Sequence, residues 1–192
     1  MSKIPDFEPI NIPINIPINI PINIPINIPI NIPINIPINI PIDVAILNEP
    51  FSASDLDQRF NALNLRSGAA GAVVTFLGQV RESGDRQDVT GLVLEHYSGM
   101  TERVLHQHIV NACQRWSLLG VVVVHRVGRM ALGENIVGVV VASQHRQAAF
   151  DAVQYLMDFL KNDVPIWKQE LTDQGAEWVE QKEADLGTVS RW

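Results

Sequence analysis

Cysteine is nearly absent from this chain, and that absence restricts its chemistry. Cys113 is the only cysteine among 192 residues, so neither an intramolecular disulfide nor a zinc site with two thiolates can form within the chain. We expect a reducing cytoplasmic location, because a lone thiol suits a compartment without disulfides. Cys113 falls on the apolar side of an expected helix, which favours a role in core packing over reactivity.

Long basic runs are also missing, and the formal net charge is −7. A chain without a cationic stretch is poorly suited to phosphate backbones, so we expect no nucleic-acid partner. The first residues hold Lys3, Pro5, Asp6 and Pro9. This segment has no uninterrupted apolar core and no small-residue cleavage site, so we expect no signal peptide.

Several motifs of common enzymes are absent. The segment Gly68–Gly71 lacks the preceding strand and the spacing of a dinucleotide loop, and the sequence has no Walker lysine and no Ser-His-Asp pattern. On a helix, His106 and His108 would point about 200° apart and could not share a metal. We therefore expect no metal site and no cofactor, and chemistry that depends on cationic side chains.

Residues 11–42 are eight tandem copies of Asn-Ile-Pro-Ile, which hold eight of the twelve prolines and no charge. A proline in every fourth position costs an α-helix roughly 3 kcal/mol each, so the repeat predicts neither a helix nor a membrane span. We expect a low-complexity segment, extended or disordered, over residues 1–42 and one globular domain over residues 43–192. The isoleucine content leaves self-association as an alternative.

From residue 43 onward, the sequence alternates between expected strands and helices. Helices are expected from a capping box at Ser54 and Asp57 to before Gly68, from Met100 to Trp116, and from about residue 145 to residues 161–163, where Pro165 prevents further helix. The segment after this helix is expected to be a bend, followed by a polar tail to Trp192. Apolar runs predict strands at 44–47, 71–80, 90–97, 121–127, 136–142 and 177–180. This order indicates an α+β fold whose apolar sheets favour dimerisation.

The stretch from Met157 to Glu170 is the strongest candidate for chemistry. Lys161 is expected on the last helical turn and Lys168 beyond the bend, so the two could converge on one pocket. In one interpretation Lys161 only complements the helix dipole and Lys168 is a solvated charge. In the other, partial burial beside Trp167 and Met157 equips a lysine to move protons or stabilise an anion.

A second cationic group is expected where the long helix begins. His145 and Arg146 follow a strand at a helix amino end, where free amides and the helix dipole attract anions. An ordinary exposed helix start remains the alternative. Arg81 directly follows another strand and is a third candidate.

Several motifs in the same order resemble the family of molybdopterin synthase catalytic (large) subunits. The resemblance covers residues 43–192 and leaves the repeat without a counterpart. It is carried by VVTFLGQVR (73–81), LEHYSGMTE (94–102), HRVG (125–128), SQHR (143–146) and YLMDFLKNDVPIWKQE (155–170).

The resemblance implies an α/β hammerhead-type domain that forms a homodimer within a heterotetramer. Its partner would be a small ubiquitin-like sulfur-carrier subunit with a C-terminal Gly-Gly thiocarboxylate. The implied reaction converts cyclic pyranopterin monophosphate to molybdopterin with two sulfurs from this carrier. No membrane partner is implied.

The same resemblance implies roles for individual residues. Lys161 and Lys168 would be catalytic, and Phe76 and Met157 would form pocket walls. Lys182 stands where we would expect an arginine, so a bidentate phosphate contact there is in doubt. The residues expected to bind substrate are Gln79, Val80, Arg81, His145, Arg146, Lys161, Lys168, Gln169 and Glu170.

Two other function classes are compatible with a cationic pocket. A lyase or hydrolase could act on a cyclic phosphate without any carrier, and a non-catalytic module could bind an acidic carrier tail without turnover.

Overall fold

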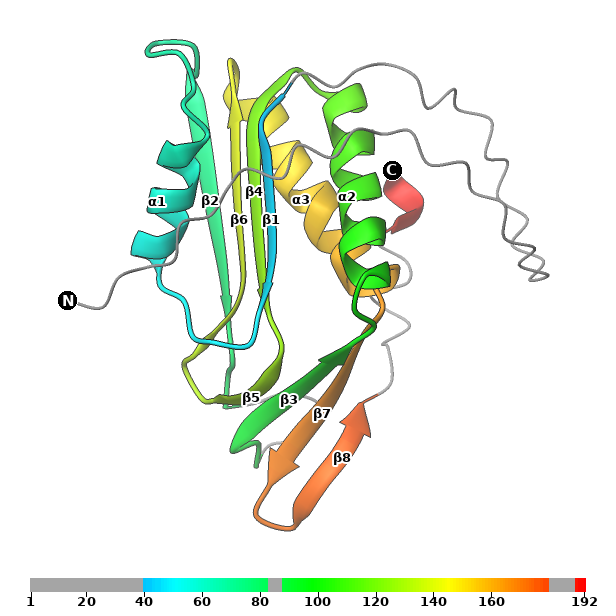
Figure 1. The fold of residues 1–192 in the computed structure, drawn as a ribbon. Helices are drawn as coiled ribbons and strands as arrows, with labels where there is room; N and C mark the ends of the chain where they lie inside the picture. Colours follow the sequence, from blue (N-terminus) through cyan, green and yellow to red (C-terminus); the bar gives the residue numbers. More distant parts are fainter. Residues whose placement is uncertain (1–39, 83–87, 180–188) are drawn as a thin grey trace. The chain divides into compact units, whose positions relative to one another are not determined.

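The computed structural model describes residues 40–82, 88–179 and 189–192, and these belong to one unit, Ile38–Trp192. Their core is a four-stranded sheet in the order β1-β4-β6-β2 (Figure 1). Its strands are β1 (Ile42–Leu47), β4 (Leu118–Arg126), β6 (Asn135–Ser143) and β2 (Ala72–Gln79). β1 pairs parallel to β4, whereas the other pairs are antiparallel.

Helices cover both faces of this sheet, which is why its central strands are continuous runs of valine. α1 (Ala53–Ala62) packs on one face, where Leu56 meets Val122, Val124 and Val140. α2 (Met100–Arg115) and α3 (Arg146–Asn162) cover the other face, over the valines of opposite pleat (Figure 1). Strands buried on two faces need no polar alternation.

α1 lies very close to the sheet because β6 has a glycine beneath it. A Cβ atom at Gly138 would lie 2.5 Å from Cδ1 of Leu56, so only glycine allows this approach.

The second sheet, in the order β5-β3-β7-β8, is antiparallel throughout. Its strands are β5 (Gly128–Ala131), β3 (Gly91–His96), β7 (Ile166–Thr172) and β8 (Gly175–Val179). Leu92, Leu94 and Met130 on one face form a separate apolar cluster with Val80 and Val89. Ile166 contacts both this cluster and the main core, so the beginning of β7 links the two sheets.

Much of the predicted element order is confirmed. The α+β class, the helix from Met100, the end of the long helix before Pro165 and the strands expected within residues 44–142 all appear. No helix in the described ranges is long and apolar enough to cross a membrane.

The predicted start of the first helix was wrong by two residues. Ser52 is the N-cap: its amide donates to Asp55 Oδ2 at 2.7 Å, and the Asp55 amide donates to Ser52 Oγ at 3.3 Å. The pattern Ser-x-x-Asp occurs twice here, at Ser52 and at Ser54. Phe51 and Leu56 pack in the same cluster on either side of Ser52, and this hydrophobic staple favours the earlier cap.

Other corrections concern the second sheet and the end of the chain. The predicted connection after Val127 contains β5, and the predicted bend after Pro165 continues directly into β7. The last strand is β8, two residues earlier than expected. The predicted polar tail ends in a packed residue, because Trp192 contacts the main core.

Candidate functional site

Lys161 lies on the last turn of α3, and its side chain is exposed. α3 ends at Asn162, and Asp163 caps it with an amide that donates to the Phe159 carbonyl at 2.8 Å. Pro165 then prevents another helical turn, and β7 begins at Ile166. Three residues therefore separate the helix from the strand, and the two predicted catalytic lysines lie on either side of this bend.

Lys168 lies on the face of β7 that borders the apolar cluster of the second sheet, which is formed by Val80, Val89, Leu92, Leu94 and Met130 and is called the second apolar cluster below. Its register partner on β3 is Leu94, a member of that cluster. Its Nζ forms an ion pair with Glu170 Oε1 at 3.0 Å, and the Glu170 side chain is only 1% exposed. The structure therefore brings Lys168 and Glu170 together.

Gln169 is separated from them by the pleat of β7. It pairs with Val93 on β3 and Trp178 on β8, on the opposite face of the sheet. The three consecutive residues predicted to bind substrate thus divide between two faces.

The predicted residues at the end of β2 have different environments. Val80 is 3% exposed in the second apolar cluster, so it contributes to packing. The side-chain Nε2 of Gln79 donates to Asn135 Oδ1 at 2.9 Å and to the Gly133 carbonyl at 3.2 Å. Arg81, by contrast, is exposed, so its guanidinium is accessible at this end of the strand.

Phe76 and Met157 lie on the side of the first sheet that α3 covers. The Phe76 side chain lies on the same face of β2 as Val74, which packs against the core beneath α2 and α3. Phe76 is 37% exposed. Met157 is half-buried one turn before Lys161 and packs against the same core. Both positions are compatible with the predicted pocket walls.

His145 and Arg146 lie at the opposite end of α3. His145 is the N-cap, Arg146 is the first helical residue, and both side chains are exposed. The His145 amide donates to Ser143 Oγ at 3.3 Å, and the Ser143 hydroxyl donates to the Ser117 carbonyl at 3.0 Å. The buried serine thereby fixes the entry into the helix.

Within one chain, the predicted cations form two groups rather than one. α3 rises about 1.5 Å per residue, so roughly 22 Å of helix separate Arg146 from Lys161. The strand pairing agrees, because Ser143 pairs with Ala72 at the start of β2, whereas Arg81 follows its end (Figure 1). A single chain therefore cannot place His145 and Arg146 beside Arg81 and Lys161.

The sequence did not reveal two polar residues of α2 that contact the bend between the lysines. Thr101 and His108 on α2 contact Pro165 and Asp163, respectively. Their separation by seven residues, two turns on the apolar side of a helix, is a pattern that could have indicated them.

Among residues 40–82, 88–179 and 189–192, no cluster of three His, Cys, Asp or Glu side chains could hold a metal. Lys182 lies outside the described residues.

The sequence matches the MoaE protein family over residues 46–163. The chain belongs to the MoaE family. A molybdopterin synthase catalytic subunit from Pseudomonas aeruginosa is 48% identical over 141 residues, which span 73% of this chain and 94% of that protein. The Vibrio cholerae subunit of the same name is 44% identical over 149 residues, 78% of this chain and 97% of that protein. The resemblance read from the sequence is thus confirmed.

Solved structures of MoaE relatives have the same fold. The MoaE protein from Burkholderia ambifaria superimposes with a TM-score of 0.64 at 36% identity, over 78% of this chain and 97% of that one. Molybdopterin synthase from Staphylococcus aureus gives 0.62 at 29% identity, over 70% and 95% of the two chains. A Helicobacter pylori complex of subunits 1 and 2 of molybdopterin-converting factor gives 0.61 at 17% identity, over 72% and 91%, and shows the fold alone.

Proposed function

We propose that this MoaE-family chain is the catalytic subunit of a molybdopterin synthase. It would convert cyclic pyranopterin monophosphate to molybdopterin with sulfur from the thiocarboxylate of a small ubiquitin-like carrier. The observation that carries the proposal is the bend between α3 and β7, which holds Lys161 and Lys168 on its two sides. A cytoplasmic location, expected from the single cysteine, is part of the proposal.

The active site of this enzyme would be shared between two copies of the chain. Lys161, Lys168 and Arg81 of one copy would face His145 and Arg146 of the other, because one chain holds these groups at opposite ends of α3. The phosphate would bind to Arg81, His145 and Arg146, which supply charge-assisted hydrogen bonds. Lys161 would stabilise charge or transfer protons while the thiocarboxylate attacks, and Lys168 would orient the pterin or the carrier tail.

β2 is the edge where a second copy would pack. It ends the order β1-β4-β6-β2, so one side of the strand has no neighbouring strand in the described part of the chain. Phe76 on β2 is 37% exposed and Phe150 on α3 is 59% exposed. Covering these rings would remove apolar surface from water, which favours dimerisation.

The sulfur would have to arrive from a partner. Burial raises the pKa of the Cys113 thiol to about 11, so at neutral pH it is protonated and a poor nucleophile. Cys113 also packs against the main core. A carrier that brings its own sulfur agrees with this environment.

The test is complementation between two inactive variants, Lys161→Ala and Arg146→Ala. Each should lose most turnover with the pterin and thiocarboxylated carrier. Denaturing and refolding an equal mixture should restore about a quarter of wild-type turnover, because half the dimers are mixed and each mixed dimer has one intact site. The control mixture of His145→Ala and Arg146→Ala should restore none, because both defects lie at the same end of α3.

Absence of complementation in mixed dimers would contradict the shared site. If Lys161→Ala kept more than half of the wild-type turnover, the catalytic assignment would be wrong. Turnover of the cyclic phosphate without carrier would indicate a lyase or hydrolase, and carrier binding without any product would indicate a binding module.

A further inference from the structure

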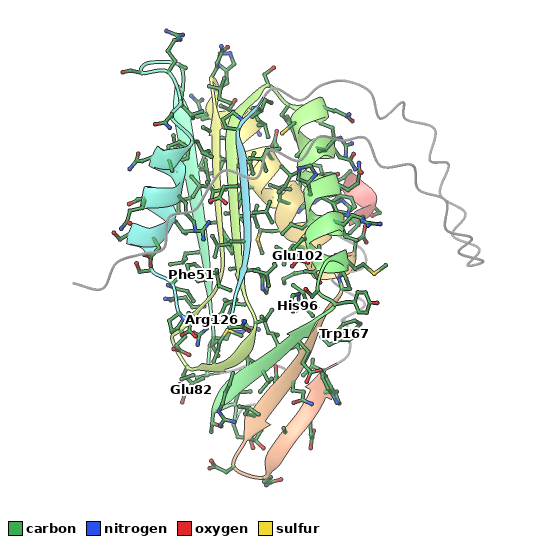
Figure 2. All side chains as sticks on the ribbon, in the orientation of Figure 1. Phe51, Glu82, His96, Glu102, Arg126 and Trp167 are labelled. Carbon is green, nitrogen blue, oxygen red and sulfur yellow. The ribbon has the colours of Figure 1, made fainter. Side chains whose placement is uncertain are left out.

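α2 contacts the bend between the two lysines at two polar points. Its residues Thr101 and His108 are buried, at 0% and 9% exposure, on the side that faces the core. β3 ends at His96, shortly before α2 begins at Met100, and His96 pairs with Ile166 at the start of β7. Figure 2 labels His96 and Glu102, which lie on the two sides of this junction in the chain. The amino end of α2 therefore lies beside the point where the bend becomes β7.

The first point is the Thr101 hydroxyl. Its Oγ1 lies 3.1 Å from the Pro165 carbonyl oxygen and 3.1 Å from the Tyr97 carbonyl oxygen. The single hydroxyl proton can be donated to only one of them at a time. The contact with Pro165 is 64 residues distant in sequence, so it fixes the bend relative to α2 rather than shaping α2 itself.

The second point is a hydrogen bond between His108 and Asp163 at the cap of α3. His108 Nε2 lies 3.2 Å from Asp163 Oδ2, and the imidazole stacks on Phe159 with ring centroids 4.3 Å apart. Burial lowers the pKa of His108, and the Asp163 carboxylate partly opposes that shift. Nε2 donates to Asp163, because a carboxylate oxygen can only accept. Nδ1 has no hydrogen-bond partner in the described residues.

Asp163 stands at an unfavourable place for a carboxylate. The carboxyl end of a helix carries partial negative charge, so an acidic cap there destabilises the helix. The interaction with His108 compensates this cost and anchors the cap to α2. Both contacts therefore act on the short segment, residues 163–165, that joins α3 to β7.

We propose that Thr101 and His108 are positioning residues, which hold the 163–165 bend so that Lys161 and Lys168 keep a fixed separation. The inference rests on the proposed function of the two lysines. Neither residue is expected to touch the substrate. Their effect passes through Pro165 and Asp163 to the backbone that carries each lysine.

The experiment compares Thr101→Val and His108→Phe, which keep size and stacking but remove the polar contact, with the wild type. Turnover at saturating substrate should fall about tenfold in each while KM changes less than about twofold, because displaced catalytic groups mainly lower the rate of the bound complex. Hydrogen exchange should become about tenfold faster at the Asp163, Val164 and Ile166 amides and stay unchanged in β4 and β6.

Matched variants separate positioning from general destabilisation. Thr101→Ser keeps the hydroxyl and should restore most of the turnover lost in Thr101→Val. Thr90→Val removes a similar hydroxyl contact, 3.2 Å from the Leu171 carbonyl at the far end of β7, and should retain turnover. His106→Phe, on the same helix as His108, should do so as well. Asp163 is 45% exposed, so Asp163→Ala should fold. It tests the contact between His108 and Asp163 in case His108→Phe does not fold.

Wild-type turnover in folded Thr101→Val and His108→Phe would overturn the proposal, as would equal losses in Thr101→Ser and Thr101→Val. Unchanged turnover and exchange in Asp163→Ala would overturn the part that involves His108. If Lys161→Ala retains turnover but the bend amides exchange faster in Thr101→Val, the proposed catalytic role of Lys161 is wrong and the positioning role of Thr101 is supported. If Lys161→Ala is inactive but hydrogen exchange at the bend amides is unchanged in Thr101→Val and His108→Phe, the positioning role of Thr101 and His108 is wrong and the catalytic role of Lys161 is supported.

Discussion

Lys168 and Glu170 form an ion pair on one face of β7, with 3.0 Å between Nζ and Oε1. The lysine side chain is 36% exposed, whereas the glutamate side chain is 1% exposed. The carboxylate is therefore buried beneath a lysine that reaches the surface. Any substitution of Lys168 changes both the candidate site and the electrostatics of the interior.

We expect Lys168→Ala to lower the free energy of unfolding by about 2 kcal/mol, because a buried carboxylate loses this ion pair. Adding Glu170→Gln should recover most of this stability, while turnover stays impaired. Urea unfolding and turnover, measured on both variants and on Lys168→Arg as the charge-preserving control, check the two effects separately. A Lys168→Ala protein as stable as the wild type would show that the pair contributes little.

The location of Lys161 at the end of a helix and of Lys168 beyond a bend could be predicted, because one proline determines where α3 ends. Pro165 lacks an amide proton and disfavours helical geometry at Val164, so the sequence alone predicts that Lys161 lies on the last turn of α3. The direction of the residues after the bend could not be predicted. Gln169 and Glu170 adjoin in sequence, but β7 pairs on both sides, and its pleat sends them to opposite faces.

The strands of the first sheet were predictable for a similar reason. A run such as Val121–Val124 is apolar in every position, which is typical of a strand buried on both faces. β5 was missed because it has only four residues and contains the exposed Arg129. It is defined by pairing with β3, a contact between distant segments that local pattern does not encode.

His125 should make stability depend on pH. Burial lowers the pKa of this histidine to about 4, against the opposing hydrogen bond to the Arg126 carbonyl. The unfolded chain, with a pKa near 6.5, takes up a proton first as pH falls. The stabilisation is therefore complete above pH 6.5 and is lost progressively between pH 6.5 and 4. From pH 7 to pH 5 the free energy of unfolding should fall by about 2 kcal/mol from this residue alone.

The measurement is urea unfolding at pH 7 and pH 5 for the wild type and His125→Asn. Asparagine cannot titrate, so the variant should lose less stability than the wild type over this interval. Equal losses in the two proteins would mean that other groups cause the acid sensitivity.

Trp192 should stabilise the domain although it is the last residue. Its ring packs edge-on against Trp116 and Tyr155, with centroids 5.6 Å from each, and its Nε1 donates to Asp158 Oδ2 at 2.7 Å. We expect Trp192→Ala to lower the free energy of unfolding by about 2 kcal/mol. The same change at the exposed Trp178 should cost less than about 0.5 kcal/mol. Thermal unfolding that ranks the two variants in reverse would contradict this role.

The last prediction concerns where the Asn-Ile-Pro-Ile repeat can be removed. β1 begins at Ile42, the final residue of the eighth copy, and the Pro41 carbonyl accepts a hydrogen bond from the Val121 amide at 3.2 Å. Ile40 and Ile42 pack against the main core. A division of the chain after residue 42, which remains a prediction, would therefore cut through contacts of the folded domain.

We expect deletion of residues 10–37 to leave dimerisation, carrier binding and sulfur transfer within about twofold of the full chain, because nothing in the deleted copies can donate a proton, bind phosphate or act as a nucleophile. Solubility should improve with the loss of fourteen isoleucines. Deletion of residues 10–42 should retain the reaction but lower the free energy of unfolding by about 2 kcal/mol, since two half-buried isoleucines and a backbone hydrogen bond to β4 are lost. Chemical unfolding and turnover of the two deletions, compared side by side, check this boundary. A monomeric or carrier-blind 10–37 deletion would mean that the repeat is an assembly element, and equal stability of the two deletions would mean that Ile40–Ile42 contribute nothing to the fold.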